Sequence, residues 1–161
     1  MEFTGFWYNP NIHGCAEYQS RLMTAGFLFQ HLSRPLIIVD PDSADFLDGL
    51  TTAHKAGKRC EFCWNRRLEK TAQAARDSGF DAFTTTLLAS RHQEHQRIKE
   101  IAEEISRRHK VVFLYRDFRT DDSREAKNLS RRLGLYHQNY CGCLFSEWEK
   151  YRRQNEPAQG N

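Results

Sequence analysis

The sequence lacks a long hydrophobic run, and this excludes a helix that spans a bilayer. No stretch of about 18 apolar residues occurs in the 161-residue chain. Residues 1–14 also lack the basic start and apolar core of a secretion signal, so we expect a cytoplasmic protein with no membrane contact. With only four prolines and nine glycines, the composition excludes collagen-like and low-complexity repeats, and favours a globular chain.

The cysteines cannot form a complete set of disulfides, because there are five of them. Four of the five fall into two close pairs, Cys60-x-x-Cys63 and Cys141-x-Cys143. Adjacent thiolates on a short turn reach one metal ion with little loss of chain entropy. The two pairs therefore predict metal ligands, whereas the solitary Cys15 is interpreted as an inert packing residue.

A strong excess of one charge is also missing, since the net charge is only +3. The charge is nevertheless uneven along the chain. Residues 1–50 contain two basic and six acidic residues, whereas residues 51–161 contain 22 basic and 15 acidic ones. This pattern is compatible with an anionic partner such as nucleic acid and equally with a solvated helical surface.

Apolar segments alternate with longer helical patterns along the chain. This alternation predicts an α/β fold of Rossmann-like type, in which a parallel sheet carries helices on both faces. We predict strands over 3–8, 36–39, 83–88 and 111–115, and helices over 15–31, 43–50, 59–77, 92–109 and 122–133. One domain is expected over residues 1–151, with a polar, disordered tail over 152–161. Because the chain opens on a strand, we expect the first βα unit of this architecture to be missing.

Polar segments follow each predicted strand. In parallel α/β folds, the segments beyond the carboxyl ends of the strands share one edge and collect ligands there. We therefore expect the following residues to lie near one another: His13, Asp40, His92, His95, Asp117 and Arg119. Many residues in such positions serve only as caps and turns.

Three interpretations of the cysteine pairs remain open at this point. Four thiolates suit either Zn²⁺ or an iron–sulfur cluster. The tight Cys-Gly-Cys spacing is unusual for a zinc ribbon, in which both pairs are normally Cys-x-x-Cys. Alternatively, Cys60 and Cys63 alone could form a redox dithiol, although the preceding strand and the internal proline or glycine of thioredoxin-type motifs are absent.

Several blocks of sequence resemble one known family. They are YNPNIH at 8–13, RCEFCWNRRLEKTA at 59–72, GFDAFTTTLLAS at 79–90, LYRDFR at 114–119 and LSRRLGLYHQNYCGCLFS at 129–146. Together they are similar to the epoxyqueuosine reductases of the QueH type, and the resemblance extends from Phe6 to Ser146.

The resemblance implies an oxidoreductase of tRNA processing. Such enzymes carry out the last step of queuosine biosynthesis, reducing the epoxide of epoxyqueuosine at the wobble position of tRNA. It also implies an iron–sulfur cluster, of 4Fe-4S type, with an additional iron nearby, and an electron donor that is a separate partner. The implied metal ligands are Cys60, Cys63, Cys141 and Cys143, and Asp117 matches the acidic residue of the family's DFR motif.

The resemblance also indicates which polar and aromatic residues belong to the expected site. His13, His92 and Asp117 are the candidate catalytic residues that bring a proton to the leaving oxygen. Basic stretches at 55–70 and 124–132 are expected to contact phosphates, and aromatic rings to stack on a splayed base. The candidate tRNA-binding residues are Trp7, Tyr8, Lys58, Arg59, Trp64, Arg66, Arg67 and Arg119.

The chain departs from the family pattern at its start. Family members usually open with a strand and a turn of the form HxCCxPC, which adds further ligands, and the present sequence begins after it. We therefore expect slow turnover from this chain. The alternative function is a non-catalytic tRNA- or protein-binding domain with a structural zinc site of four cysteines.

Overall fold

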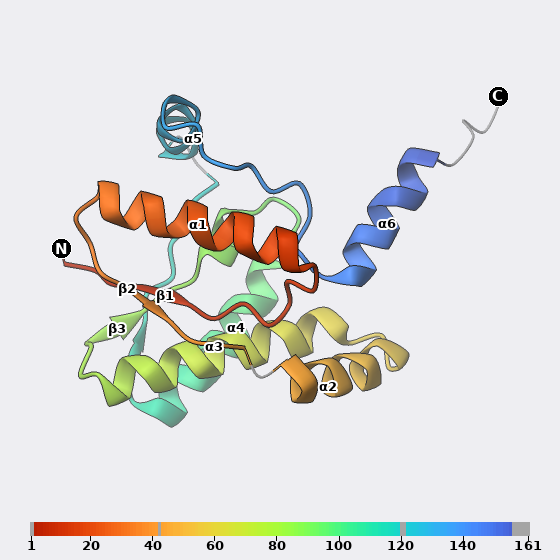
Figure 1. Ribbon diagram of the computed structural model, residues 1–161. Helices are drawn as coiled ribbons and strands as arrows, with labels where there is room; N and C mark the ends of the chain where they lie inside the picture. The colour runs from red at the N-terminus through yellow and green to blue at the C-terminus, as the bar shows by residue number, and fades with distance from the viewer. Residues whose placement is uncertain (1, 42, 120–121, 156–161) are drawn as a thin grey trace. The chain divides into compact units, whose positions relative to one another are not determined.

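The structure is a computed structural model that describes residues 2–41, 43–119 and 122–155. Its elements are β1 (Gly5–Trp7), α1 (Cys15–His31), β2 (Leu36–Ile38), α2 (Ser43–Lys55), α3 (Arg59–Asp77), β3 (Ala82–Phe83), the 3₁₀ helix η1 (Thr86–Ala89), α4 (His95–His109), β4 (Val112–Phe113), α5 (Asp122–Arg132) and α6 (Leu144–Asn155) (Figure 1). The chain divides into two compact units. We call Met1–Pro41 with Leu135–Asn161 the α1 unit, and Asp42–Gly134 the α3 unit.

The α1 unit contains a βαβ arrangement. Strands β1 and β2 pair in parallel, with Gly5 opposite Leu36 and Trp7 opposite Ile38. Helix α1 connects them, as a parallel pair requires. Arg21 is the one buried residue of α1, and this buried charge indicates that α1 is part of a polar site.

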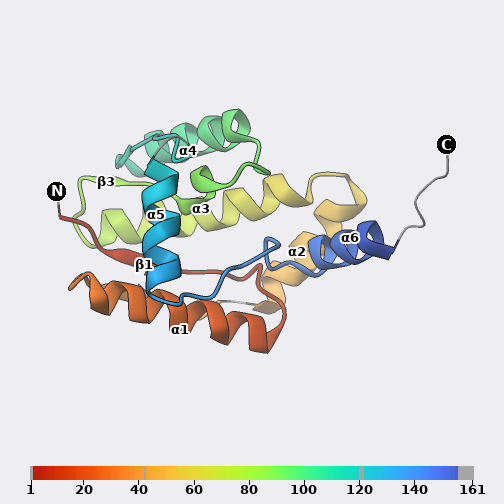
Figure 2. The same cartoon turned by 90° about the horizontal axis from the view of Figure 1, so that it is seen from above.

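The α3 unit has the larger apolar core. Helices α3 and α4 pack side by side in it (Figure 2). On α4, Ile98, Ile101, Ala102 and Ile105 are buried, and this confirms the inward face that the helical periodicity predicts. They meet the α3 residues Trp64, Leu68, Ala72 and Ala75. Strands β3 and β4 form a second parallel pair at the edge of this core.

The parallel strand pairs and the helices confirm the α/β class. The described strands form two separate pairs, β1–β2 and β3–β4, whereas we expected one continuous sheet. The strand predicted over 83–88 was wrong beyond Phe83, because the Thr85 hydroxyl accepts a hydrogen bond from the Leu87 amide and starts η1. The helix predicted from residue 92 begins only at His95.

The C-terminal region contains a helix that the sequence analysis did not predict. Helix α6 continues to Asn155, so residues 152–155 are helical, whereas we expected a disordered tail from residue 152. The remainder of that predicted tail, residues 156–161, lies outside the described residues. Among the described helices, none combines the length and the apolar character that crossing a bilayer requires.

Candidate functional site

The Cys141-Gly142-Cys143 loop lies directly before α6 and rests on the segment that follows β1. The Gly142 carbonyl accepts a hydrogen bond from the His13 amide at 3.1 Å. Gly142 has φ +103°, and a Cβ at this position would stand 2.8 Å from Cγ1 of Ile12. Only glycine combines this backbone conformation with so close an approach.

Arg21 holds the backbone that enters this loop. Its guanidinium donates from Nη2 to the Tyr140 carbonyl at 2.9 Å and from Nη1 to the Cys141 carbonyl at 3.2 Å. It also donates to Oε1 of Gln138 at 2.6 Å and, from Nε, to Oε1 of Glu17 at 2.7 Å. A buried guanidinium needs such a complete set of acceptors, and here they fix the path of residues 138–141.

Two further residues complete the support of the loop. Asn11, which is 2% exposed, donates from Nδ2 to the Cys141 carbonyl at 2.9 Å. The Tyr136 hydroxyl donates to Oε2 of Glu17 at 2.5 Å. Burial opposes ionisation of Glu17, but the hydrogen bonds from Tyr136 and Arg21 outweigh it and lower the pKa of the carboxyl group. The supporting network is therefore ionised at neutral pH.

The two sulfur atoms of the loop lie close together. The Cys143 side chain is buried, whereas that of Cys141 is exposed. A hydrogen bond with Cys141, followed by burial, raises the pKa of the Cys143 thiol. The Ser146 amide donates to Sγ of Cys143 at 3.4 Å, at the start of α6. Two adjacent soft donors, with a backbone N–H aimed at one of them, fit a thiolate-bound metal.

His13 lies beside these sulfurs. Its Nδ1 accepts a hydrogen bond from the Leu144 amide at 3.2 Å. Burial lowers the pKa of the imidazole, and the charge of Cys141 partly offsets this effect. In the neutral ring, Nδ1 is therefore the acceptor and Nε2 carries the proton.

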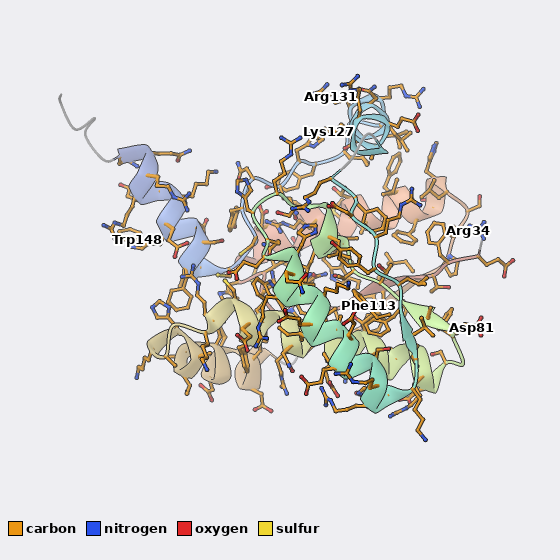
Figure 3. The ribbon with its side chains drawn as sticks, turned by 180° about the vertical axis from the view of Figure 1, so that it is seen from behind. Arg34, Asp81, Phe113, Lys127, Arg131 and Trp148 are labelled. Carbon is orange, nitrogen blue, oxygen red and sulfur yellow. The ribbon has the colours of Figure 1, made fainter. Side chains whose placement is uncertain are left out.

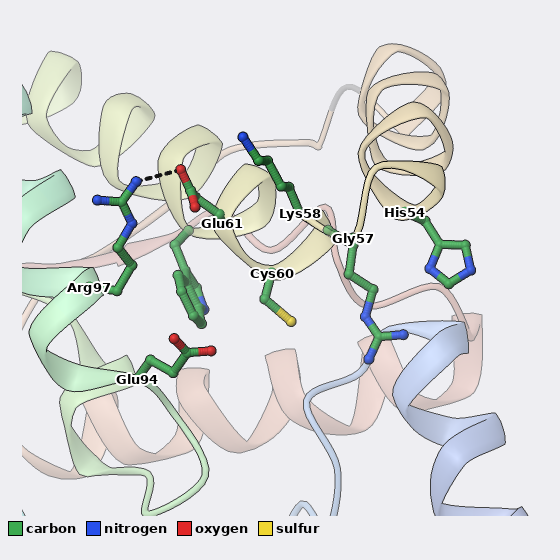
Figure 4. Close-up of a pocket in the computed structure, with 9 residues that line it drawn as sticks. His54, Gly57, Lys58, Cys60, Glu61, Glu94 and Arg97 are labelled. Atoms are coloured by element: carbon green, nitrogen blue, oxygen red, sulfur yellow. Dashed lines mark hydrogen bonds and ion pairs between the residues drawn. The ribbon is translucent and has the colours of Figure 1, made fainter.

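The Cys60 pair lies in the α3 unit, where Cys60 borders a cavity of about 440 Å³. Figure 4 shows the Cys60 side chain directed into the space that these residues surround. Cys63 follows one turn later on α3 and is half-buried. The residues that line the cavity include both cations and anions. They are His54, Gly57, Lys58, Arg59, Cys60, Glu61, Trp64, Glu94 and Arg97.

Charges inside this cavity are partly paired. Arg97 donates to Oε1 of Glu61 at 2.7 Å, and this contact is drawn in Figure 4. The hydrogen bond lowers the pKa of Glu61 and holds the arginine at one side of the cavity. Cys60 therefore lies in a polar cavity lined by charged groups of both signs.

Three of the residues expected at one sheet edge do lie together in the α3 unit. The Arg119 side chain donates to both carboxylate oxygens of Asp117, at 2.8 and 2.5 Å. These bonds keep the pKa of Asp117 far below its usual range, and the nearby His95 adds to the effect. Because Asp117 is ionised, it can serve as an anion or a proton acceptor, and it has no proton to give at neutral pH.

The two neighbouring histidines differ in burial. His95 is buried, and its Nε2 donates to the Ser90 carbonyl at 3.0 Å. His92 is exposed, and its amide donates to the Ser90 hydroxyl at 3.2 Å. His13 and Asp40 belong to the α1 unit, so the predicted gathering of all six residues remains a prediction.

The aromatic residues expected to stack on a base are packed against protein. Trp7 donates from Nε1 to the Tyr18 hydroxyl at 2.9 Å, and Tyr8 is 8% exposed. Trp64 is 5% exposed, and its Nε1 donates to Oε1 of Gln93 at 2.7 Å. Among the basic candidates, Lys58, Arg66 and Arg119 are exposed, whereas Arg59 and Arg67 are half-buried. The tRNA contacts of these residues remain predictions.

The four predicted cysteine ligands are divided between the units, with Cys60 and Cys63 in one and Cys141 and Cys143 in the other. Among the described residues, no three His, Cys, Asp or Glu side chains gather into a group that could hold a metal ion. The four-cysteine ligand set therefore remains a prediction. Each pair alone offers two thiols and would need further ligands.

Sequence reasoning missed the residues that support the Cys-Gly-Cys loop, namely Asn11, Arg21, Gln138 and Ser146. The spacing of Glu17 and Arg21, four residues apart on a helix, was the only available signal, and such pairs are common on helix surfaces. The roles of Asn11, Arg21 and Gln138 depend on contacts across more than 100 residues of sequence.

Comparison with known proteins gives consistent results. The family model described as Epoxyqueuosine reductase QueH matches residues 1–149. A protein of Dehalococcoides mccartyi named Epoxyqueuosine reductase QueH is 36% identical over 155 residues, which cover 95% of this chain and 83% of that protein. A protein of the same name from Thermotoga maritima is 35% identical over 158 residues, covering 94% of this chain and 82% of its own length.

Proposed function

The chain belongs to the epoxyqueuosine reductase QueH family, and from this premise we propose that it reduces epoxyqueuosine to queuosine in tRNA. The observation that carries the proposal is the family match, which extends over residues 1–149 and includes all five cysteines. The chain is accordingly an oxidoreductase of queuosine biosynthesis by family.

The reaction sets the requirements for the site. Two C–O bonds of the epoxide break, one C=C bond forms, and the oxygen leaves as water. This balance needs two electrons and two protons. No ordinary side chain supplies two electrons repeatedly, so they must come through a redox group from a separate electron donor.

We propose an iron–sulfur cluster as that group, with an additional iron, and the thiolates of Cys60, Cys63, Cys141 and Cys143 as ligands. When bound, such a cluster would supply electrons one at a time, and the additional iron would supply a Lewis acid for the epoxide oxygen. The contact between the Ser146 amide and Cys143 Sγ supports this assignment, because N–H donors to sulfur stabilise the ionised form of a ligand.

The residues of the chain have separate roles in this proposal. His13 is neutral and holds its proton at Nε2, since its Nδ1 accepts from the Leu144 amide, so we propose that it donates a hydrogen bond from Nε2 to the leaving oxygen. Asp117 acts as a fixed anion, oriented by Arg119. His92 is exposed and remains the alternative proton donor.

We propose that phosphates of the tRNA contact helix α5. Arg124, Lys127 and Arg131 recur at helical spacing and are all exposed, and no ion pair joins them to another described residue. Figure 3 labels Lys127 and Arg131 on this helix. Like charges at this spacing destabilise an isolated helix, and a polyanionic partner would reverse that effect.

The proposal is tested by a single-turnover assay. Anaerobic protein in excess over tRNA that carries epoxyqueuosine is mixed with a chemical reductant, and the nucleosides are identified by mass spectrometry. We expect queuosine to form, and the double substitution of Cys141 and Cys143 by alanine to abolish it. Absence of queuosine with wild-type protein that contains iron and binds the tRNA would contradict the proposed function.

The same assay addresses the two alternatives. A tRNA- or protein-binding domain with structural zinc would form no queuosine, and a zinc chelator would unfold it. A thiol–disulfide oxidoreductase that uses Cys60 and Cys63 would keep its activity after substitution of Cys141 and Cys143.

A further inference from the structure

Helix α6 presents an exposed apolar face. Leu144, Trp148 and Tyr151 are 60, 58 and 56% exposed, and their spacing of four and three residues places them on one face of the helix. The rings of Trp148 and Tyr151 stack on each other, with centroids 5.5 Å apart and planes 18° from parallel. No described residue of α6 is buried, so this face is not part of the core.

The exposure of Trp148 distinguishes it from the other two tryptophans. Trp7 and Trp64 each donate their indole N–H to a protein oxygen, and Trp64 is buried whereas Trp7 is half-buried. A large, rigid and solvated ring pair is the kind of surface on which nucleic-acid bases stack.

The charge beside this ring pair identifies the kind of partner. Lys150, Arg152 and Arg153 bring three cations within four residues of α6, against Glu149 within the same turn and Glu147 one turn earlier. Arg152 and Arg153 are exposed. Aromatic faces for bases and cations for phosphates together form the pattern of single-stranded RNA binding. A second copy of this chain would face the same cations and gain less from them.

The position of α6 relates this surface to the proposed reaction. The helix begins immediately after Cys143, and its first turn donates the Ser146 amide to Cys143 Sγ. Figure 1 shows α6 starting beside the amino end of α1 and extending away from it. Trp148 is labelled on α6 in Figure 3. A nucleotide stacked there would lie on the same unit as the Cys-Gly-Cys loop.

We propose that α6 binds the unpaired loop of the tRNA substrate, with a base stacked on the Trp148–Tyr151 pair and phosphates on Lys150 and Arg153. This inference rests on the proposed function for the identity of the RNA. It adds a binding element that lies outside the previously predicted base-stacking residues.

The test measures binding of an unmodified anticodon stem-loop RNA by fluorescence anisotropy. We expect Trp148→Ala to weaken binding by about five- to 150-fold, the effect of losing one base–aromatic stack, and Trp148→Phe to restore most of it. The matched control is Phe27→Ala, which removes an aromatic ring that is 50% exposed on α1, and it should leave the affinity unchanged.

Salt dependence separates stacking from charge. Trp148→Ala removes no cation, so the slope of log K against log salt should stay the same, whereas Arg153→Gln should reduce its magnitude by roughly 0.7. A blunt RNA duplex, which offers no unstacked base, should not discriminate between wild type and Trp148→Ala.

Two results would overturn the inference. One is equal stem-loop affinity of wild type and Trp148→Ala. The other is a change of oligomeric state in Trp148→Ala, measured by light scattering, with unchanged RNA affinity, which would assign the face to a second copy of this chain. Because the RNA is unmodified, these results are independent of catalysis. If wild-type protein reduces epoxyqueuosine and Trp148→Ala binds the RNA as tightly as wild type, the inference about α6 is refuted and the proposed function is not.

Discussion

Replacement of Gly142 by alanine tests the close packing of the Cys-Gly-Cys loop. The added Cβ would stand 2.8 Å from Cγ1 of Ile12 and 3.3 Å from its Cα and from Nη1 of Arg21. The backbone has φ +103°, which L-residues rarely adopt. Both effects act on the same backbone position, and the Ile12 Cα cannot rotate out of the way.

The magnitude follows from these two contributions. A residue held in an unfavourable backbone region costs about 1–3 kcal/mol, and overpacking of a close contact costs about 1–3 kcal/mol more. We therefore expect Gly142→Ala to lower the free energy of unfolding by about 2–6 kcal/mol. A typical domain has about 5–15 kcal/mol in total, so the loss is large enough to measure by urea denaturation.

Two other glycines serve as matched controls. Gly134 has φ +61° but no atom within 4 Å of its virtual Cβ, so Gly134→Ala tests backbone strain alone, at about 1–2 kcal/mol. Gly26 lies within α1 with open space around it, and Gly26→Ala should stabilise the protein by up to about 1 kcal/mol. Equal unfolding midpoints for Gly142→Ala and Gly134→Ala would refute the close approach of the loop to Ile12.

Three further predictions concern the charged groups of the two units. Arg21→Lys keeps the charge but loses hydrogen bonds to most of the four acceptors, so we expect the free energy of unfolding, measured by urea denaturation, to fall by about 2–4 kcal/mol. We also expect a lower iron content after anaerobic purification, and unchanged stability and iron content would contradict the supporting role of Arg21. The pKa of the Glu17 carboxyl is below its ordinary 4.5 in the folded protein, so the ionised carboxylate stabilises the fold fully above pH 4.5 and loses this effect as the pH falls through the folded pKa. Glu17→Gln should therefore flatten the pH dependence of the unfolding free energy below pH 4.5, and the same pH dependence in wild type and variant would argue against the linkage. Charge reversal of Lys127 and Arg131 should reduce the salt slope of tRNA binding by roughly one per contact, whereas reversal of Lys99, which pairs with Glu103 on α4, should leave the slope unchanged.

The sequence predicted those features that depend on local patterns. The inward face of α4 follows from helical periodicity, and the long helices were predicted to within a few residues. The strand over 83–88 failed because a threonine side chain competes for a backbone amide, which a count of β-branched residues does not detect. Helix α6 was missed although Leu144, Trp148 and Tyr151 have helical spacing.

The support of the candidate site could not be predicted from the sequence. The Cys-Gly-Cys spacing predicts metal ligands, because two close thiolates reach one ion with little loss of chain entropy, and this ligand set stays a prediction. The role of the buried Arg21 could not be inferred, because three of its four acceptors lie 117 to 120 residues away in the sequence and two of these three are backbone carbonyls. Side chains that bond to the backbone leave no composition signal, so they are found only from a structure.

The most direct test of the central claim, that the thiolates of this chain hold a redox centre, is the metal content of anaerobically purified protein. We predict a brown protein that contains iron and acid-labile sulfide, with broad absorption near ~400 nm that disappears in the Cys141→Ala and Cys143→Ala variants. Colourless protein with stoichiometric zinc would contradict the account and favour the structural zinc domain.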